Sequence, residues 1–173
     1  MSTRIVVGDL FASGAEALVN PINAYGVSGK GLAKVFKERF PQNQRILERY
    51  VREHGPIPAG EVAVMELTLS GTEPRYIINV PTKRHWSEYS SLTLIRKSAE
   101  GLADVVRSRR IRSVAVPALG TGLGGLPWAE VVDVLEAVLG DLDADVMLYP
   151  PDAVQAVQAF DGSLNKRRKR GKS

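Results

Sequence analysis

The sequence predicts an α/β fold in which helices cover both faces of a mixed β-sheet. Short apolar runs alternate with segments of helical periodicity, a turn joins two of the runs, and glycine-rich loops follow two others. The 173 residues are enough for one domain with a substantial core. We therefore expect a three-layer α/β/α domain over residues 1–152, followed by a C-terminal tail over residues 153–173.

Six apolar segments predict the strands of this sheet, and four segments with helical spacing predict its helices. The strands are Arg4–Leu10, Ala17–Ile22, Glu61–Leu69, Arg75–Pro81, Ser113–Leu119 and Asp145–Tyr149. The helices are Gly31–Phe40, Gln42–His54, Ser91–Arg110 and Pro127–Leu142. Pro41 separates the first two helices because proline cannot continue a helix. The turn at residues 70–74 predicts an antiparallel hairpin.

The composition excludes several classes of site. The sequence has no cysteine and only two histidines, His54 and His85, so we expect no disulfide, no metal site and no cofactor. No apolar run reaches the roughly 18 residues of a membrane helix, and the N-terminus lacks a secretory segment. We therefore expect a cytoplasmic protein that is a monomer and has no membrane attachment.

Basic residues are concentrated at the C-terminal end of the chain. Residues 1–160 hold 17 Lys and Arg against 18 Asp and Glu, whereas residues 161–173 hold six Lys and Arg against one Asp. The net charge of +4 therefore comes from the run at residues 166–172. Such a run is typical of a solvated, disordered tail, and it can also raise affinity for DNA or RNA by counterion release. Both interpretations stay open.

Two glycine-rich loops carry the main functional signal. The first spans residues 20–31, the second spans residues 117–126, and each lies between an apolar run and an amphipathic helix. Glycine allows backbone N–H groups to approach an anion closely, and helix N-termini favour negative charge. Two such loops facing one another would hold a pyrophosphate. The sequence therefore predicts a nucleotide-diphosphate ligand, and two glycine turns without a ligand are the alternative.

Two familiar phosphate-binding motifs do not fit these loops. Residues 120–125 match the dinucleotide fingerprint by letter, but only one further strand follows, whereas that fingerprint belongs to the first strand of a large sheet. Gly29-Lys30 resembles the glycine-lysine pair of a P-loop, but Gly31 replaces the hydroxyl residue that binds magnesium. A P-loop nucleotide hydrolase is therefore disfavoured.

The arrangement as a whole resembles a macrodomain, the ADP-ribose-binding α/β/α module, over about residues 3–150. The resemblance rests on residues 7–10, 17–23 and 117–123 taken together. It implies that Asp9 accepts from the adenine amino group, that Asn23 and the first loop hold the distal ribose, and that the second loop cradles the diphosphate. The ligand contacts that it implies are Asp9, Leu10, Asn20, Asn23, Gly29, Lys30, Gly31, Leu119, Gly120, Thr121, Gly122, Leu123, Gly124 and Tyr149.

Within the macrodomains, the chain resembles the branch of the DNA ADP-ribosyl glycohydrolase DarG, which is related to terminal ADP-ribose protein glycohydrolase. The shared elements are residues 29–33, the pair Thr82-Lys83 and residues 120–123. The resemblance implies that Lys83 is catalytic. The protein glycohydrolase has an aspartate where this chain has Gly124, so removal of ADP-ribose from DNA bases fits the chain better. The implied partners are ADP-ribosylated DNA and a DarT-like toxin, which gives the chain an antitoxin and DNA-repair role.

Residues 83–86 follow an apolar strand and carry the candidate chemistry. A solvated lysine at a strand end is the structural interpretation of Lys83, but Arg84 beside it would lower its pKa and favour a nucleophilic amine. His85 is a candidate proton donor or a plain surface histidine. Trp86 would stack on a nucleobase or cover the edge of the core. A non-catalytic ADP-ribose-binding module and a hydrolase of ADP-ribosylated protein remain alternatives.

Overall fold

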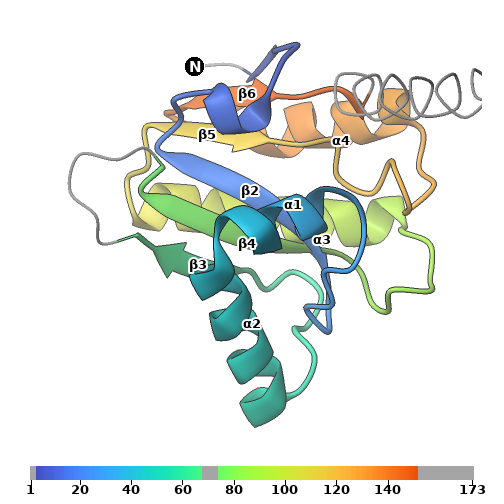
Figure 1. Ribbon diagram of the computed structural model, residues 1–173. Coiled ribbons are helices and arrows are strands. Elements are labelled where there is room, and N and C mark those ends of the chain that lie inside the picture. Colours follow the sequence, from blue (N-terminus) through green and yellow to red (C-terminus); the bar gives the residue numbers. More distant parts are fainter. Residues whose placement is uncertain (1–2, 68–73, 152–173) are drawn as a thin grey trace, which may run out of the picture.

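The computed structural model describes residues 3–67 and 74–151, which build a six-stranded sheet between two layers of helices (Figure 1). The strands run in the spatial order β1-β6-β5-β2-β4-β3. All neighbouring strands are parallel except β3 and β4, which form the expected antiparallel hairpin. The strand bounds are β1 Thr3–Ile5, β2 Ala17–Asn23, β3 Ala63–Glu66, β4 Tyr76–Lys83, β5 Ser113–Val116 and β6 Asp145–Leu148. The mixed sheet predicted from the sequence is confirmed.

Helices cover both faces of the sheet, as Figure 1 shows. The helix bounds are α1 Gly31–Arg39, α2 Pro41–His54, α3 Leu92–Ser108 and α4 Trp128–Leu139, with a short 3₁₀ helix at Leu10–Ala12. One core joins α3 and α4 to the sheet, and separate clusters join α1 and α2 to its other face. Among the described residues, none of these helices has both the length and the apolar character needed to cross a membrane.

The central strands are apolar at most positions because both of their faces are buried. In β2, Leu18 packs in the cluster with Phe36 of α1, whereas its neighbour Val19 packs in the core with α3 and α4. In β4, Ile77 and Ile78 divide between the two layers in the same way. Successive side chains of a strand point to opposite faces, so a sheet covered on both sides favours apolar residues on both faces of its central strands. This explains the continuous apolar runs in the sequence.

The predicted strands 4–10 and 113–119 end earlier in the structure, because a turn follows each. β1 stops at Ile5 because Gly8 adopts a φ of +148° and the Asp9 carboxylate accepts from the Phe11 N–H at 2.9 Å, which starts the 3₁₀ helix. β5 stops at Val116 because the backbone turns at Pro117, whose carbonyl accepts from the Leu119 N–H at 2.8 Å. The predicted strands 4–10 and 113–119 were therefore too long, and their last residues form loops at the carboxyl edge of the sheet.

Three buried asparagines tie α2 to the sheet. Asn20 and Asn79 stand opposite one another on β2 and β4, and the Asn79 Oδ1 accepts from the Asn20 and Asn43 amides at 2.9 Å each. Asn79 returns a hydrogen bond to the Asn43 Oδ1 at 2.8 Å. Buried amides are expensive to leave unpaired, so this network favours one register of β2 against β4. The register then shifts by one residue between Ile22 and Asn23, and this irregularity pairs Asn23 with Lys83 at the ends of the two strands.

Candidate functional site

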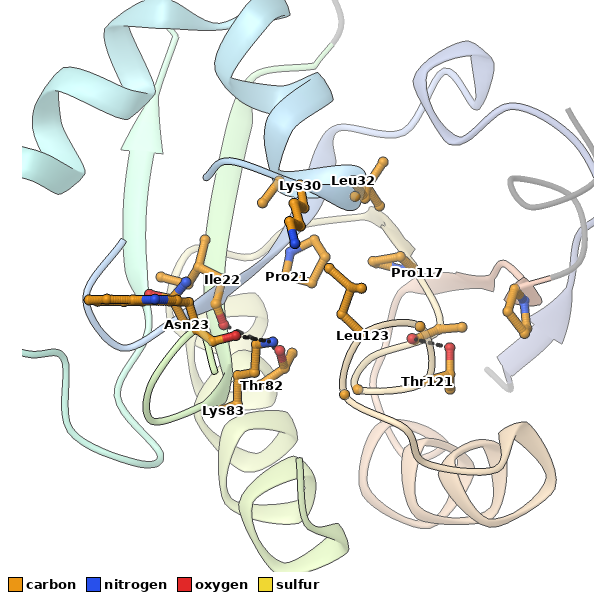
Figure 2. Close-up of a pocket in the computed structure, with 18 of the residues that line it drawn as sticks. Pro21, Ile22, Asn23, Lys30, Leu32, Thr82, Lys83, Pro117, Thr121 and Leu123 are labelled. Atoms are coloured by element: carbon orange, nitrogen blue, oxygen red, sulfur yellow. Dashed lines mark hydrogen bonds between the residues drawn. The ribbon is translucent and has the colours of Figure 1, made fainter. Parts of the chain in front are cut away.

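A cavity of about 650 Å³ opens at the carboxyl edge of the sheet, and both glycine-rich loops line it. Figure 2 shows Asn23, Thr82 and Lys83 at one end of the cavity and Thr121 at the other. A methyl group on Gly31 in the first loop would lie 3.8 Å from Leu123 Cδ1 in the second. The predicted residues that line the cavity are Leu10, Asn23, Gly29, Lys30, Gly31, Lys83, Gly120, Thr121, Gly122, Leu123, Gly124 and Tyr149.

The second loop offers several unpaired backbone N–H groups to the cavity. Two carbonyls of this loop already accept hydrogen bonds from the protein. Gly120 O accepts from the Leu126 N–H at 2.9 Å, and Gly124 O accepts from the Ser90 N–H at 3.0 Å. The Thr121 hydroxyl donates to the Ala118 carbonyl at 2.8 Å (Figure 2). No hydrogen bond to another described residue uses four N–H groups, those of Gly120, Gly122, Leu123 and Gly124. Clustered free N–H groups suit a diphosphate.

Close packing fixes the backbone of this loop. Gly120 has a φ of +74°, and a Cβ there would lie 3.0 Å from the side chains of Ile95, Leu126 and Ser90. A Cβ on Gly124 would lie 2.3 Å from Ser90 Oγ and 2.5 Å from the Gly120 carbonyl oxygen. No side chain fits at position 124 without movement of the backbone. The absence of an aspartate there, noted in the sequence, is therefore built into the loop.

The amide side chain of Asn23 holds the backbone of the first loop through hydrogen bonds. The Asn23 Oδ1 accepts from the N–H groups of Tyr25 at 3.1 Å and Val27 at 3.2 Å, and its Nδ2 donates to the Val27 carbonyl at 2.7 Å. Gln44 of α2 donates to the Gly26 carbonyl at 3.0 Å. Because an amide nitrogen has two N–H groups, Asn23 retains one that it can offer to a ligand. Asn23 thus holds the loop and also lines the cavity.

The first loop ends at the N-terminus of α1, which also faces the cavity. Lys30 occupies the N-cap position and makes no side-chain hydrogen bond to the first turn, and Gly29, Lys30 and Gly31 all line the cavity. The first N–H groups of a helix carry a partial positive charge and bind anions. The two loops therefore present N–H groups to the same space from two directions.

The opposite end of the cavity is apolar and aromatic. Leu10 and Tyr149 line it together with Pro150 and Pro151, which follow β6. Tyr149 is only 4% exposed, and this burial raises the pKa of its hydroxyl, which keeps the ring neutral. A neutral ring in an apolar recess suits the face of a nucleobase. The aromatic character of this end agrees with the adenine position expected from the sequence.

Four of the predicted site residues do not line the cavity. The Asp9 carboxylate is bonded to the Phe11 N–H, and the Asn20 amide is buried against Asn79 beneath α2. Leu119 is fully buried in the core with α3 and α4. His85 lies beside the cavity, where its Nδ1 bonds the Ser87 hydroxyl at 2.6 Å and accepts from the Ser87 N–H at 3.2 Å. Each of the four is instead committed to local structure.

Lys83 is the last residue of β4, and its amine points to the turn that follows. Its Nζ donates to the Trp86 carbonyl at 3.0 Å. Burial lowers the pKa of the Lys83 amine, and the positive charge of Lys30 lowers it further. The sequence prediction named Arg84 as the cause of this shift, which is wrong, because the relevant cation comes from the first loop. A charge on the first loop therefore affects the protonation of the amine at the end of β4.

Several cavity residues were not among the predicted site residues. Pro21, Ile22 and Thr82 line the cavity near Lys83 (Figure 2), and the Thr82 hydroxyl donates to the Ile22 carbonyl at 3.2 Å. Trp86, for which the sequence left open stacking on a nucleobase or cover of the core edge, also lines the cavity and is 51% exposed. Pro21, Ile22 and Thr82 belong to the ends of β2 and β4. The rule that parallel strands carry ligand residues at their carboxyl ends could have identified them.

The charge of the cavity favours an anion. Of the described residues that line it, Lys30 and Lys83 are cationic and none is a carboxylate. Among the described residues, no group of three His, Cys, Asp or Glu side chains lies close enough to hold a metal ion. An anion bound here would meet the positive charge of Lys30 and no carboxylate of the described lining.

Comparison with known proteins identifies the family. The family model described as "Macro domain" matches residues 19–135. The chain belongs to the macrodomain family. This confirms the resemblance predicted from the sequence, and the three-layer architecture with a mixed sheet is the one that the family has.

Among its curated relatives, this macrodomain is 40% identical over 158 residues to the DNA ADP-ribosyl glycohydrolase of Mycobacterium tuberculosis, covering 90% of this chain and 44% of that protein. It is 39% identical to the protein of the same name from Thermus aquaticus, covering 86% of this chain and 41% of that protein. The chain therefore spans less than half the length of these relatives.

Solved structures give the same assignment. The macrodomain of Mycobacterium tuberculosis DarG superimposes with a TM-score of 0.80 at 38% identity, covering 86% of this chain and 97% of that one. Thermosipho africanus DarTG in complex with ADP-ribose superimposes with a TM-score of 0.79 at 30% identity, covering 87% of this chain and 42% of that one. The DarG-like branch predicted from the sequence is thus confirmed.

Proposed function

We propose that this macrodomain removes ADP-ribose from modified DNA bases by hydrolysing the N-glycosidic bond. The observation that carries the proposal is that the Lys83 amine and both glycine-rich loops line one cavity. The DNA substrate follows from the relatives at 39–40% identity, which are named DNA ADP-ribosyl glycohydrolases. The complex of Thermosipho africanus DarTG with ADP-ribose supports the choice of ligand.

ADP-ribose would extend across the cavity between its two ends. The adenine would lie against Tyr149 and Leu10, and the free N–H groups of residues 120–124 would cradle the diphosphate. The distal ribose would then lie by Asn23 and Lys83, which stand side by side at the ends of β2 and β4. Binding energy from the adenine and diphosphate would position the anomeric carbon at the amine.

Lys83 would act on the anomeric carbon as a nucleophile. A lowered pKa leaves more of the amine neutral, and a neutral amine can donate one N–H to the Trp86 carbonyl while its lone pair stays free. The bond from Nζ to the anomeric carbon forms as the bond from that carbon to the base nitrogen breaks. The base keeps the bonding electron pair and takes up the proton that Nζ gives up. Water then hydrolyses the lysine adduct, which releases ADP-ribose and restores the amine.

Position 124 supports DNA over protein as the substrate. The related protein glycohydrolase uses an aspartate here, and in this chain Ser90 Oγ and the Gly120 carbonyl occupy the space that its Cβ would need. The described cavity lining supplies no carboxylate elsewhere, so this chain lacks the group that the related glycohydrolase uses on protein substrates. Esters of protein carboxylates are therefore the poorer substrate.

The partner implied by this function is a DNA ADP-ribosyl transferase whose product the chain would reverse. A 31% identical relative from Thermosipho africanus is named a fusion of such a transferase with a DNA ADP-ribosyl glycohydrolase. A glycohydrolase that acts on the transferase product would serve as its antitoxin and as a DNA repair enzyme.

A direct test compares the wild type with Lys83→Ala on a single-stranded oligonucleotide that carries ADP-ribosylated bases. We expect the variant to release ADP-ribose at least about 100-fold more slowly, which is the range of an essential catalytic group. Calorimetry should show that both proteins bind free ADP-ribose within about fivefold of one another. Lys34→Ala is the control, because Lys34 is an exposed lysine of α1 that does not line the cavity.

Two results would contradict the proposal in different ways. Equal release by the wild type and Lys83→Ala would remove Lys83 from the mechanism. Tight binding of ADP-ribose by the wild type with no release from DNA would instead indicate a reader of ADP-ribose. An assay on ADP-ribosylated protein, run in parallel, tests the third possibility.

A further inference from the structure

Three aromatic rings gather at the end of the cavity that holds Lys83. Trp86 lies in the turn after β4, and its ring packs against that of His85 with centroids 3.6 Å apart and planes inclined by 32°. Tyr25 comes from the first glycine-rich loop and meets both rings edge-on, at 5.8 Å from Trp86 and 5.6 Å from His85. We call Tyr25, His85 and Trp86 the aromatic cluster.

Hydrogen bonds hold the aromatic cluster in place, while the Trp86 ring is about half exposed to solvent. His85 is fixed by its two hydrogen bonds to Ser87, so it supports one side of Trp86. The Trp86 backbone is fixed by the hydrogen bond from Lys83. Trp86 is nonetheless 51% exposed and lines the cavity, and Tyr25 is 41% exposed. A rigid, half-open indole is a surface on which a flat ring can stack.

The cluster contributes little to the core of the domain. Among the described residues, Tyr25 and Trp86 belong to none of the hydrophobic clusters that join helices to the sheet. Their contacts link two loops at the mouth of the cavity. Exposed aromatic residues beside a cavity indicate a binding role more than a structural one.

The position of the cluster relative to Lys83 indicates what it would contact. The Lys83 amine lies 3.0 Å from the Trp86 carbonyl, so the indole and the amine belong to one short turn. Because Trp86 and Lys83 both line the cavity, a group attached to the anomeric carbon at Lys83 would lie within reach of the indole. Lys30, an exposed cation that also lines the cavity, would favour a phosphate next to that group.

We propose that the aromatic cluster stacks, on Trp86, the nucleobase that carries the ADP-ribose in a single-stranded nucleic acid. This inference rests on the proposed function, because it assigns the second half of the substrate of the same site. Bases in a duplex are covered by their neighbours, so only an unpaired or extruded base could reach the indole. Aromatic stacking accepts any base, so the cluster would supply affinity for nucleic acid without strict sequence preference.

The test measures binding separately from turnover. In a Lys83→Arg background, whose guanidinium is not a nucleophile and can still donate to the Trp86 carbonyl, the affinities of a singly ADP-ribosylated single-stranded DNA and of free ADP-ribose are compared by titration. We expect the oligonucleotide to bind about tenfold more tightly than ADP-ribose, and adding Trp86→Ala to abolish that advantage without changing ADP-ribose affinity more than about twofold. Trp86→Phe should retain most of it, because it keeps an aromatic face. Tyr89→Ala is the matched control, since Tyr89 is an exposed aromatic residue near the cluster that does not line the cavity.

Quenching of tryptophan fluorescence by the oligonucleotide is expected if a base stacks on Trp86, and it is not expected if Trp86 has only a structural role. The chain has two tryptophans, Trp86 and Trp128, so the oligonucleotide should quench emission in Trp128→Phe and not in Trp86→Phe. Matched RNA, duplex DNA and ADP-ribosylated peptide probes show whether the stacked group is a DNA base, an RNA base or neither. We expect the single strands to gain from Trp86 and the duplex and peptide probes to gain nothing.

The outcomes separate this inference from the proposed function. An equal loss of oligonucleotide and ADP-ribose affinity in Trp86→Ala, no loss in either, or an equal gain for the peptide would overturn stacking on a base. Binding that depends on Trp86 without any release by the wild type would support the stacking and refute the hydrolase. Release that is unaffected by Trp86→Ala, together with unchanged binding, would refute the stacking and support the hydrolase.

Discussion

The two glycine-rich loops look alike in sequence and are built differently. Hydrogen bonds from Asn23 and Gln44 hold the first loop, and the space beside Gly29 is empty to at least 4 Å. Packing holds the second loop, where Gly120 and Gly124 have backbone or side-chain atoms within 3.0 Å of the Cβ positions. The comparison shows that crowding requires glycine at positions 120 and 124 of the second loop, whereas Gly29 of the first loop leaves room for a side chain.

The largest effect is expected at Gly124, where the second loop has no space. The added methyl group of Gly124→Ala would meet Ser90 Oγ and the Gly120 carbonyl, so the backbone must shift. Overpacking of this kind typically lowers the free energy of unfolding by about 1–3 kcal/mol. We also expect at least about tenfold weaker ADP-ribose binding, because the N–H groups of the loop would move. Chemical denaturation and calorimetry measure the two effects.

Gly122→Ala is the matched control for that change. It adds the same methyl group to the same loop at a position with nothing within 4 Å. Its free energy of unfolding should stay within about 0.5 kcal/mol of the wild type, as for surface substitutions. Equal destabilisation by the two variants would show that glycine flexibility, and not crowding, fixes the second loop.

We expect an intermediate effect, on the pH dependence of ADP-ribose release, from substitution of Lys30. The charge of this first-loop residue acts on Lys83. If the neutral Lys83 amine is the reactive form, the rate of ADP-ribose release rises with pH through the pKa of Lys83 and levels off above it. The charge of Lys30 lowers that pKa, so Lys30→Gln should raise the pKa and move the rise to higher pH. Burial, the larger cause, remains in the variant, so the pKa should stay below its usual range.

The rate of release measured across a pH series tests this, with Lys34→Gln as a charge-matched control outside the cavity. A shift of the profile to lower pH in Lys30→Gln would contradict the sign of the interaction. ADP-ribose affinity should fall at most about fivefold, the range of an exposed ion pair.

The smallest effect is expected at Gly29. Gly29→Ala adds a methyl group where the loop is open, so the free energy of unfolding should change by less than about 0.5 kcal/mol and ADP-ribose affinity by less than about threefold. Thermal denaturation and calorimetry provide the measurement. A loss as large as that of Gly124→Ala would show that both loops are equally crowded once the ligand is bound.

The sequence predicted the elements better than their ends. Apolar runs identified all six strands of the sheet, because the two helical layers bury both faces of the central ones. The runs at residues 4–10 and 113–119 continue past the strands, because apolar residues after each strand are also buried: Leu10 lies in one core cluster and Leu119 in another. Hydrophobic pattern reports burial, and it cannot show where the backbone stops pairing.

The expected site residues also fall into two groups, those whose role depends on the backbone and those whose role depends on a side chain. Gly120 and Gly122, whose expected role depends on the backbone, line the cavity because the position of the loop brings them there. Two residues whose expected role depends on the direction of a side chain lie elsewhere. Asn20 faces the α2 side of the sheet and bonds Asn79, and His85 turns to Ser87, so neither lines the cavity. Side-chain direction depends on neighbours that are distant in sequence.

By itself, the sequence determined the three-layer fold, the two loops and the family, because hydrophobic periodicity and glycine placement are local properties of the chain. Only the tertiary structure decided that Lys30 and not Arg84 acts on Lys83, that Ser90 closes position 124, and that Tyr25 joins Trp86. Each of these contacts joins segments that the parallel sheet brings together at one edge, and the strength of a charge, a clash or a ring contact depends on distance in space.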